Sequence, residues 1–177
     1  MGAVAGVVGG HLVVAGGWAD GVGDLTSVEA YTPTGWAPLP PLPHATSLAT
    51  ARVLNGRLYV MGGGQCNKLQ VLEMSDENEF TWTVKADLPA QRHDAASAAH
   101  ESKIWLMGGK VDYVESSSVL IYDIDADSWG TGPALPGTAA GAHAVALAGE
   151  IYVSYDMDTA ATWVYRNAAW VDAVDRP

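Results

Sequence analysis

Leu58-Tyr59-Val60-Met61-Gly62-Gly63 is the stretch that decides the fold, because its pattern recurs twice elsewhere in the chain. Four apolar residues followed by two glycines are also found at residues 12–17 and 104–109, and the second glycines are 46 residues apart both times. An apolar run that stops at two glycines predicts a buried strand ending in a sharp bend. A fixed spacing of this size indicates a repeat architecture.

Composition favours an all-β chain. The 177 residues include 20 glycines, and only 16% are charged. Many glycines and few charges in a chain rich in Val, Tyr and Trp are typical of strands joined by tight turns. The chain is long enough to bury a sizeable core within a single domain.

The charge and the cysteine content narrow the choice of partner and compartment. A formal net charge of −11 argues against unaided binding to nucleic acid or anionic lipid, and it favours a partner with basic features. The single cysteine, Cys66, excludes an intrachain disulfide and favours a reducing, cytoplasmic compartment. No stretch is apolar for long enough to span a bilayer as a helix, so we expect no membrane association.

The repeats divide the chain into four similar units. Asn55-Gly56 between two apolar runs predicts a β-hairpin, and a tryptophan follows each double glycine after 19, 19 and 20 residues. We therefore expect a single domain over 1–177 that contains four meanders of four strands. In the fourth unit Tyr155-Asp156 stands in place of the double glycine. The expected units cover approximately residues 3–43, 47–89, 94–136 and 141–175.

Together, the double glycine, a Tyr or Tyr-Asp at the end of the third strand and the later Trp resemble the kelch repeat. The resemblance covers essentially the entire chain. It implies that each unit is a four-stranded antiparallel blade of a β-propeller-like array, with the first strand nearest the axis and the Trp strand outermost. The Ala, Gly and Val content of the first strands agrees with a crowded centre.

The number of blades departs from the family, whose propellers usually close with six or seven. Three arrangements stay open: a small closed ring of four blades, an open arc that is part of a longer kelch protein, and an arc completed by a second copy. Repeat arrays usually protect their ends with altered units, and the fourth repeat here is altered. We expect an open or weakly closed arc that self-associates through its exposed end blades.

The resemblance also implies a binding face, formed by the loops between second and third strands and by the connections between blades. Arg92 follows the Pro-containing connection, where kelch repeats often carry an arginine, and guanidinium grips carboxylates well. A bond from Arg92 to carbonyl groups of a neighbouring blade is an equal alternative. The predicted binding residues are Arg92, His93, Trp18, Asn67, Lys68, Lys110 and Tyr113.

The sequence signals for a metal site or a reactive cysteine are weaker than those for the binding face. The segment 123–127 resembles a calcium loop, but Ser128 replaces its turning glycine and Ala134 its bidentate acid. Cys66 beside Lys68 fits either a reactive thiolate or an ordinary loop cysteine, and the ordinary role is favoured. We therefore expect no metal site and no cofactor.

The function predicted from these patterns is a kelch-type protein-interaction module that binds a protein or peptide through its loops. Phosphate-loop, nucleophile-elbow and zinc-protease motifs do not occur, which favours a binding protein over an enzyme. The alternative is a small-ligand or sugar-processing enzyme, since such enzymes are also built on kelch-like propellers. A third interpretation is a partial segment of a larger kelch protein.

Overall fold

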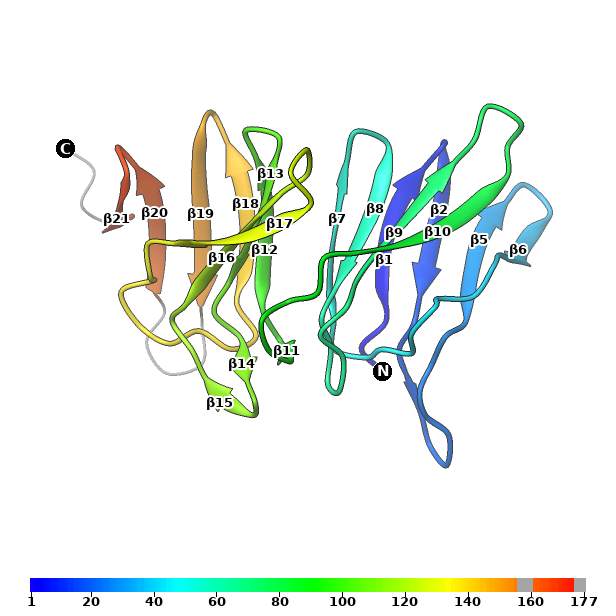
Figure 1. The fold of residues 1–177 in the computed structure, drawn as a ribbon, viewed down its shortest axis with the longest axis horizontal. Coiled ribbons are helices and arrows are strands. Elements are labelled where there is room, and N and C mark those ends of the chain that lie inside the picture. Colours follow the sequence, from blue (N-terminus) through cyan, green and yellow to red (C-terminus); the bar gives the residue numbers. More distant parts are fainter. Residues whose placement is uncertain (156–160, 174–177) are drawn as a thin grey trace. The chain divides into compact units, whose positions relative to one another are not determined.

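The computed structural model describes residues 1–155 and 161–173, and within these ranges the chain forms strands and no helix (Figure 1). None of the described segments is therefore a helix long and apolar enough to cross a membrane. Four sheets have four antiparallel strands each. The predicted all-β fold of four four-stranded blades is confirmed. Asp156 and the expected end of the fourth blade at residue 175 lie outside the described residues.

Each blade is a meander in which consecutive long strands pair. The strands of blade 1 are β1 (Val4–Val8), β2 (His11–Ala15), β5 (Val28–Thr32) and β6 (Gly35–Pro38). Those of blade 2 are β7 (Thr50–Leu54), β8 (Arg57–Met61), β9 (Leu69–Met74) and β10 (Phe80–Lys85). Those of blade 3 are β12 (Ala96–His100), β13 (Lys103–Met107), β16 (Val119–Asp123) and β17 (Ser128–Gly132). Those of blade 4 are β18 (His143–Leu147), β19 (Glu150–Tyr155), β20 (Ala161–Arg166) and β21 (Ala169–Asp172).

All four blades share one register at the turn between their first and second strands. In each blade a two-residue turn joins the last residue of the first strand to the first residue of the second strand, and both turn residues have positive φ, as in Asn55-Gly56. This common turn defines which residues are equivalent between blades. The equivalent pairs are Val8 with His11, Leu54 with Arg57, His100 with Lys103, and Leu147 with Glu150.

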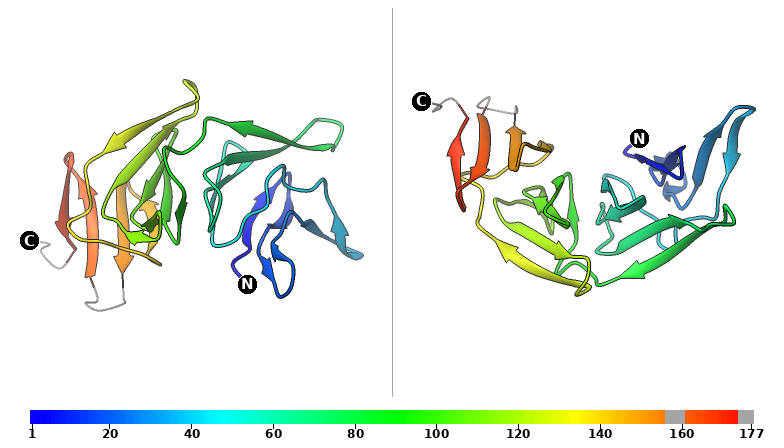
Figure 2. Two further views of the ribbon diagram at one scale, coloured as in Figure 1. Left: turned by 60° about the horizontal axis from the view of Figure 1, so that its bottom comes forward. Right: turned by 90° about the horizontal axis from the view of Figure 1, so that it is seen from above.

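The chain separates into two compact units, Met1–Arg92 and His93–Pro177, and each contains two blades. The expectation of a single domain over 1–177 stays a prediction. Figure 2 shows each unit as a pair of sheets lying face against face. In the first unit β1 packs against β7, β8 and β9, and in the second unit β12 packs against β18 and β19.

Each unit has an apolar core between its two blades. In the first unit small side chains of blade 1, such as Val8 and Ala30, meet Leu58, Val60 and Leu72 of blade 2. In the second unit Ala96 and Ala98 of β12 meet aromatic residues of blade 4, including Trp163. Burial of such side chains from water is the main stabilising contribution within each unit.

The outer-strand tryptophans fasten neighbouring blades to each other. Trp82 Nε1 donates a hydrogen bond to the carbonyl oxygen of Pro40 at 2.9 Å. In the second unit Trp170 Nε1 donates to the carbonyl oxygen of Pro133 at 2.8 Å. The Trp of one blade thus holds the Pro-containing connection that leaves the preceding blade.

Candidate functional site

The double glycines fix the points where the candidate binding loops leave the blades. In each of the first three blades the N–H of the second glycine donates to a carbonyl oxygen of the connection to the next blade. The three bonds are Gly17 to Thr46 at 2.8 Å, Gly63 to Arg92 at 2.8 Å and Gly109 to Ala139 at 2.6 Å. All these glycines have positive φ. The backbone approaches so closely that a Cβ on Gly62 would lie 2.3 Å from the carbonyl oxygen of Arg92.

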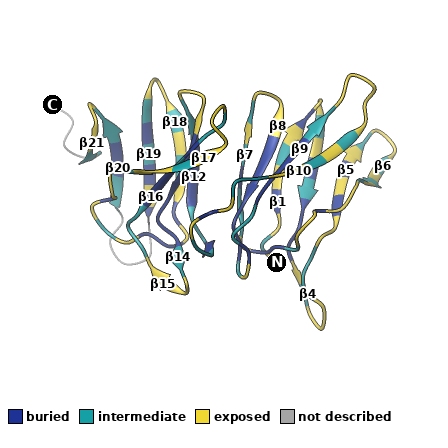
Figure 3. Cartoon of the chain, in the orientation of Figure 1, coloured by how far each residue is buried: buried dark blue, intermediate teal, exposed yellow. Residues whose placement is uncertain are grey.

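Two of these loops form small hairpins of their own, which the sequence did not indicate. In blade 1 the loop contains β3 (Trp18–Ala19) paired with β4 (Gly23–Asp24), and in blade 3 it contains β14 (Lys110–Val111) paired with β15 (Val114–Glu115). The N–H of Leu25 or Ser116 donates to the carbonyl oxygen of the second glycine and closes the base of each hairpin. Both hairpins have exposed tips (Figure 3).

The tip of the β14–β15 hairpin carries an exposed aromatic residue in a strained backbone. Asp112 and Tyr113 form the two-residue turn and have φ of +49° and +67°. Tyr113 is 63% exposed and the next residue, Val114, is 69% exposed. The left-handed conformation is unfavourable for a bulky residue, so this arrangement maintains Tyr113 at the tip against a conformational cost.

The β3–β4 hairpin of blade 1 has a similar character. Trp18 is 42% exposed and Val22 is 72% exposed. The backbone of Trp18 is held in place, because its N–H donates to the carbonyl oxygen of Met1 at 2.8 Å and its own carbonyl accepts from the terminal amine of Met1. At the base, Asp24 Oδ1 accepts a hydrogen bond from Ser47 Oγ at 2.6 Å.

Arg92, the predicted anchor, lies inside the protein. It is 5% exposed, and burial lowers the pKa of its guanidinium to about 10. Its position is equivalent to Thr46 and Ala139, because the carbonyls of all three accept the bond from a double glycine. The backbone of Arg92 therefore has a structural role, and direct contact of its side chain with a partner stays a prediction.

His93 is also buried, with 8% exposure. It lies in β11 (Arg92–His93), and the first strand begins at Ala96. Its Nδ1 lies 3.0 Å from Asp94 Oδ2, and its ring centroid lies 5.4 Å from that of Tyr113. The structure thus brings together two of the predicted binding residues, His93 and Tyr113.

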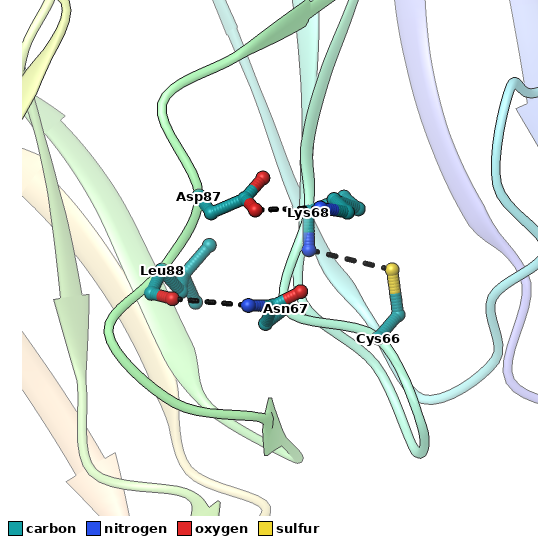
Figure 4. Close-up of polar contacts among 5 residues, drawn as sticks. All are labelled: Cys66, Asn67, Lys68, Asp87 and Leu88. Atoms are coloured by element: carbon teal, nitrogen blue, oxygen red, sulfur yellow. Dashed lines mark hydrogen bonds and ion pairs between the residues drawn. The ribbon is translucent and has the colours of Figure 1, made fainter.

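The short loop of blade 2 is tied to the chain that follows β10 (Figure 4). Lys68 Nζ pairs with Asp87 Oδ2 at 2.5 Å, and Asn67 Nδ2 donates to the carbonyl oxygen of Leu88 at 3.3 Å. Cys66 is 5% exposed, and its Sγ accepts from the N–H of Lys68 at 3.4 Å. Burial raises the pKa of the Cys66 thiol, and this effect outweighs the nearby Lys68. The ordinary buried cysteine is thus the supported interpretation.

The predicted binding residues fall into two groups. Trp18, Asn67, Lys68 and Arg92 belong to the first unit, whereas His93, Lys110 and Tyr113 belong to the second. Lys110 lies partly buried in β14. Val22 and Val114 were not among the residues predicted from the sequence. Each is an apolar residue in a loop, Val22 between two glycines and Val114 after Asp112-Tyr113, and this pattern could have indicated them.

The described residues provide no group of three or more His, Cys, Asp and Glu side chains that could hold a metal ion. The segment that resembles a calcium loop is instead a turn organised by Asp123. Its Oδ1 accepts from the N–H groups of Asp125 and Ala126 at 3.1 and 3.0 Å. Its Oδ2 lies 3.1 Å from Lys103 Nζ. These bonds lower the pKa of Asp123, with the bond from Ala126 contributing most.

The chain is similar in sequence to known kelch proteins. The family described as the Kelch motif matches residues 91–136, which correspond to the third repeat. The chain is 28% identical to mouse (Mus musculus) Kelch-like protein 35 over 81% of its length and 25% of that protein. It is 30% identical to human (Homo sapiens) Kelch repeat and BTB domain-containing protein 13, over 76% of this chain and 31% of that protein. The chain therefore spans between a quarter and a third of the length of these relatives.

A solved structure shows the same fold. The structure of YjhT superposes with a TM-score of 0.70 at 18% identity, covering 86% of this chain and 58% of that chain. At this identity the similarity concerns the fold alone.

Proposed function

Because the chain belongs to the kelch-repeat family, we propose that it is a protein-interaction module whose loop hairpins bind a partner peptide or protein segment. Tyr113 is the observation that carries this proposal. It is an aromatic side chain, 63% exposed, at the tip of a tight hairpin and in a backbone conformation that costs stability. Strained backbone conformations are concentrated at binding sites, where they hold a side chain in the position needed for binding.

The chemistry of both hairpins suits a protein partner. Tyr and Trp combine a large contact area with few rotatable bonds, so they lose little conformational entropy on binding and are enriched in interface hot spots. Tyr113 with Val114, and Trp18 with Val22, each form an exposed apolar pair. We assign Tyr113 and Trp18 the role of anchors, one in each unit.

The charge around these anchors favours a basic partner. Asp112 and Glu115 are exposed beside Tyr113, and Asp20 is exposed near Trp18. These acids accompany a net charge of −11, which steers basic segments toward the protein. We therefore propose a partner segment that combines Lys or Arg with an apolar residue.

The remaining predicted residues support the loops or surround the anchors. The His93 ring lies tilted against the Tyr113 ring, with an interplanar angle of 58°, so we propose that His93 positions the anchor. Asn67 and Lys68 brace the short loop of blade 2, and Lys110 begins the anchor hairpin. The carbonyl oxygen of Arg92 accepts the hydrogen bond from Gly63, where the blade 2 loop begins.

A peptide selection tests the proposal. A random peptide library displayed on phage is selected on the immobilised full chain, and a selected peptide is synthesised with a fluorescent label for anisotropy measurements. We expect selected peptides to be enriched in Lys and Arg. Tyr113→Ala should weaken a peptide that binds the β14–β15 hairpin, and Trp18→Ala a peptide that binds the β3–β4 hairpin, by roughly tenfold or more, the usual effect of removing a hot spot.

The matched control is Val84→Ala, which removes an exposed apolar side chain from an outer strand (41% exposed) instead of a loop. It should leave the affinity unchanged. Peptides that bind Tyr113→Ala and Trp18→Ala as tightly as the wild type would reject the hairpins as the binding site.

A further inference from the structure

Blade 1 exposes an apolar position whose equivalents in the other three blades, Leu58, Ile104 and Ile151, are each 0% exposed. Leu12 follows the first residue of its second strand, and by the shared turn register it is equivalent to Leu58 of blade 2 and Ile151 of blade 4. Leu58 and Ile151 are 0% exposed, because each packs against the preceding blade of its unit. Leu12 is 42% exposed. The face of blade 1 that points away from blade 2 therefore carries an apolar residue at a position that, in blades 2 and 4, packs against the preceding blade.

Blade 4 exposes apolar residues at positions that, in blades 1 and 3, pack against the following blade. Val145 and Leu147 of β18 are 56% and 63% exposed. The residue equivalent to Val145 in blade 3 is Ala98, and the residue equivalent to Leu147 in blade 1 is Val8. Ala98 is 1% exposed and Val8 is 0% exposed, because each faces the following blade of its unit.

A shallow hollow accompanies the exposed face of blade 4. It has a volume of about 170 Å³ and lies at the pairing of β18 with β19. Its lining is formed by His143, Ala144, Val145, Tyr152 and Ser154. A surface hollow beside exposed Val and Leu side chains is suited to receive an apolar side chain.

The contact between blades 1 and 2 shows how two such faces fit together. Leu58 of blade 2 packs directly over Gly6 of blade 1, where an added Cβ would lie 2.5 Å from Leu58 Cδ1. Leu12 is the repeat equivalent of Leu58, and Val145 is the repeat equivalent of Gly6. One chain therefore exposes, at Leu12 and at Val145, the equivalents of the two residues that meet in the contact between blades 1 and 2.

From this equivalence we propose that a second copy of the chain covers these faces, with blade 1 of one copy docking on blade 4 of another and Leu12 packing into the hollow beside Val145. The contact is heterologous, since it joins two different surfaces. It is independent of the loop hairpins, and it continues the blade-to-blade packing of each unit across two chains.

Sedimentation equilibrium of the full chain, from about 1 μM to about 300 μM, tests this proposal. We expect the average mass to rise reversibly with concentration. Leu12→Asp and Leu147→Asp place a charge in opposite halves of the contact, and each variant alone should stay monomeric over this range. Both positions are exposed, so thermal melting at low concentration should be unchanged.

Mixing the two variants gives a sharper result. The Leu12→Asp chain keeps an intact blade 4 face and the Leu147→Asp chain keeps an intact blade 1 face, so an equimolar mixture should recover one contact and form a dimer. Val84→Asp is the matched control and should associate like the wild type. A wild type that stays monomeric throughout, or an association that either single variant leaves intact, overturns the proposal.

Discussion

The N–H of Gly63 donates a 2.8 Å hydrogen bond to the carbonyl oxygen of Arg92, joining the end of the second strand of blade 2 to the connection that leaves that blade. The equivalent bonds at Gly17 and Gly109 show that this is the general structural role of the double glycine. It also explains why the position of Arg92 is buried. The loops that carry the exposed anchors begin at these bonds.

The first prediction concerns Gly63→Ala. Gly63 has a φ of +130°, and an added Cβ would lie 1.8 Å from Thr46 Oγ1 and 2.8 Å from the carbonyl oxygen of Ser47. Both the conformation and the clash disfavour a side chain, so we expect a loss of about 3 kcal/mol or more in the free energy of unfolding. Urea denaturation measures this loss. Gly56→Ala is the control, because its Cβ would meet nothing within 4 Å, and it should cost only about 1 kcal/mol.

The second prediction concerns Gln70, which is 0% exposed and holds both polar groups of the His44 backbone. Gln70 Oε1 accepts from the N–H of His44 at 2.8 Å, and Gln70 Nε2 donates to its carbonyl oxygen at 3.0 Å. Gln70→Leu keeps the apolar volume but removes both partners, so we expect a destabilisation of about 2–4 kcal/mol. Hydrogen exchange at the His44 amide should become much faster. Protection equal to that of the wild type would contradict the assigned role.

The third prediction is a pH dependence at Asp123. Hydrogen bonds from Ala126 and Asp125 and the contact with Lys103 lower its pKa below the ordinary value of 3.8. A lowered pKa stabilises the fold above the unfolded-state value, and this contribution disappears as the pH falls through the folded-state value. The urea midpoint of the wild type should therefore exceed that of Asp123→Ala at pH 7, by a margin that shrinks below about pH 4.

The Asp123→Asn variant separates the charge from the turn geometry. Asn retains an oxygen that accepts from both N–H groups but lacks the charge that pairs with Lys103. Its midpoint at pH 7 should lie between those of the wild type and Asp123→Ala. A difference between wild type and Asp123→Ala that is constant from pH 7 to about pH 3 would contradict the prediction.

The fold was largely predictable because its signals are local and repeated. The double glycines, Asn55-Gly56 and the regularly spaced Trp residues each specify a strand end or a turn, and their fixed period required the four blades to be alike. The packing between blades followed from the small residues of the first strands.

The candidate site was less predictable, since burial and loop geometry depend on contacts far apart in the sequence. Arg92 was selected because it follows the Pro-containing connection, where kelch repeats often carry an arginine. In the structure its carbonyl oxygen accepts the hydrogen bond from Gly63 of blade 2. The β14–β15 hairpin was missed because Asp112-Tyr113 contains no glycine, although both residues adopt positive φ. Exposure of Leu12 became informative only when its buried equivalents were known.

The fourth prediction tests the central claim that the strained hairpin tip exists for binding. Tyr113→Gly relieves the positive φ of +67° and removes the exposed aromatic ring. Stability should stay unchanged or rise by up to about 1 kcal/mol, because glycine adopts this conformation freely but loses more backbone entropy on folding.

The most direct measurement is the dissociation constant of a selected basic peptide for wild type and Tyr113→Gly, determined by anisotropy beside their urea denaturation curves. The account predicts an affinity at least roughly tenfold weaker in a variant that is no less stable. An unchanged affinity, or a loss of affinity that only follows a loss of stability, would contradict it.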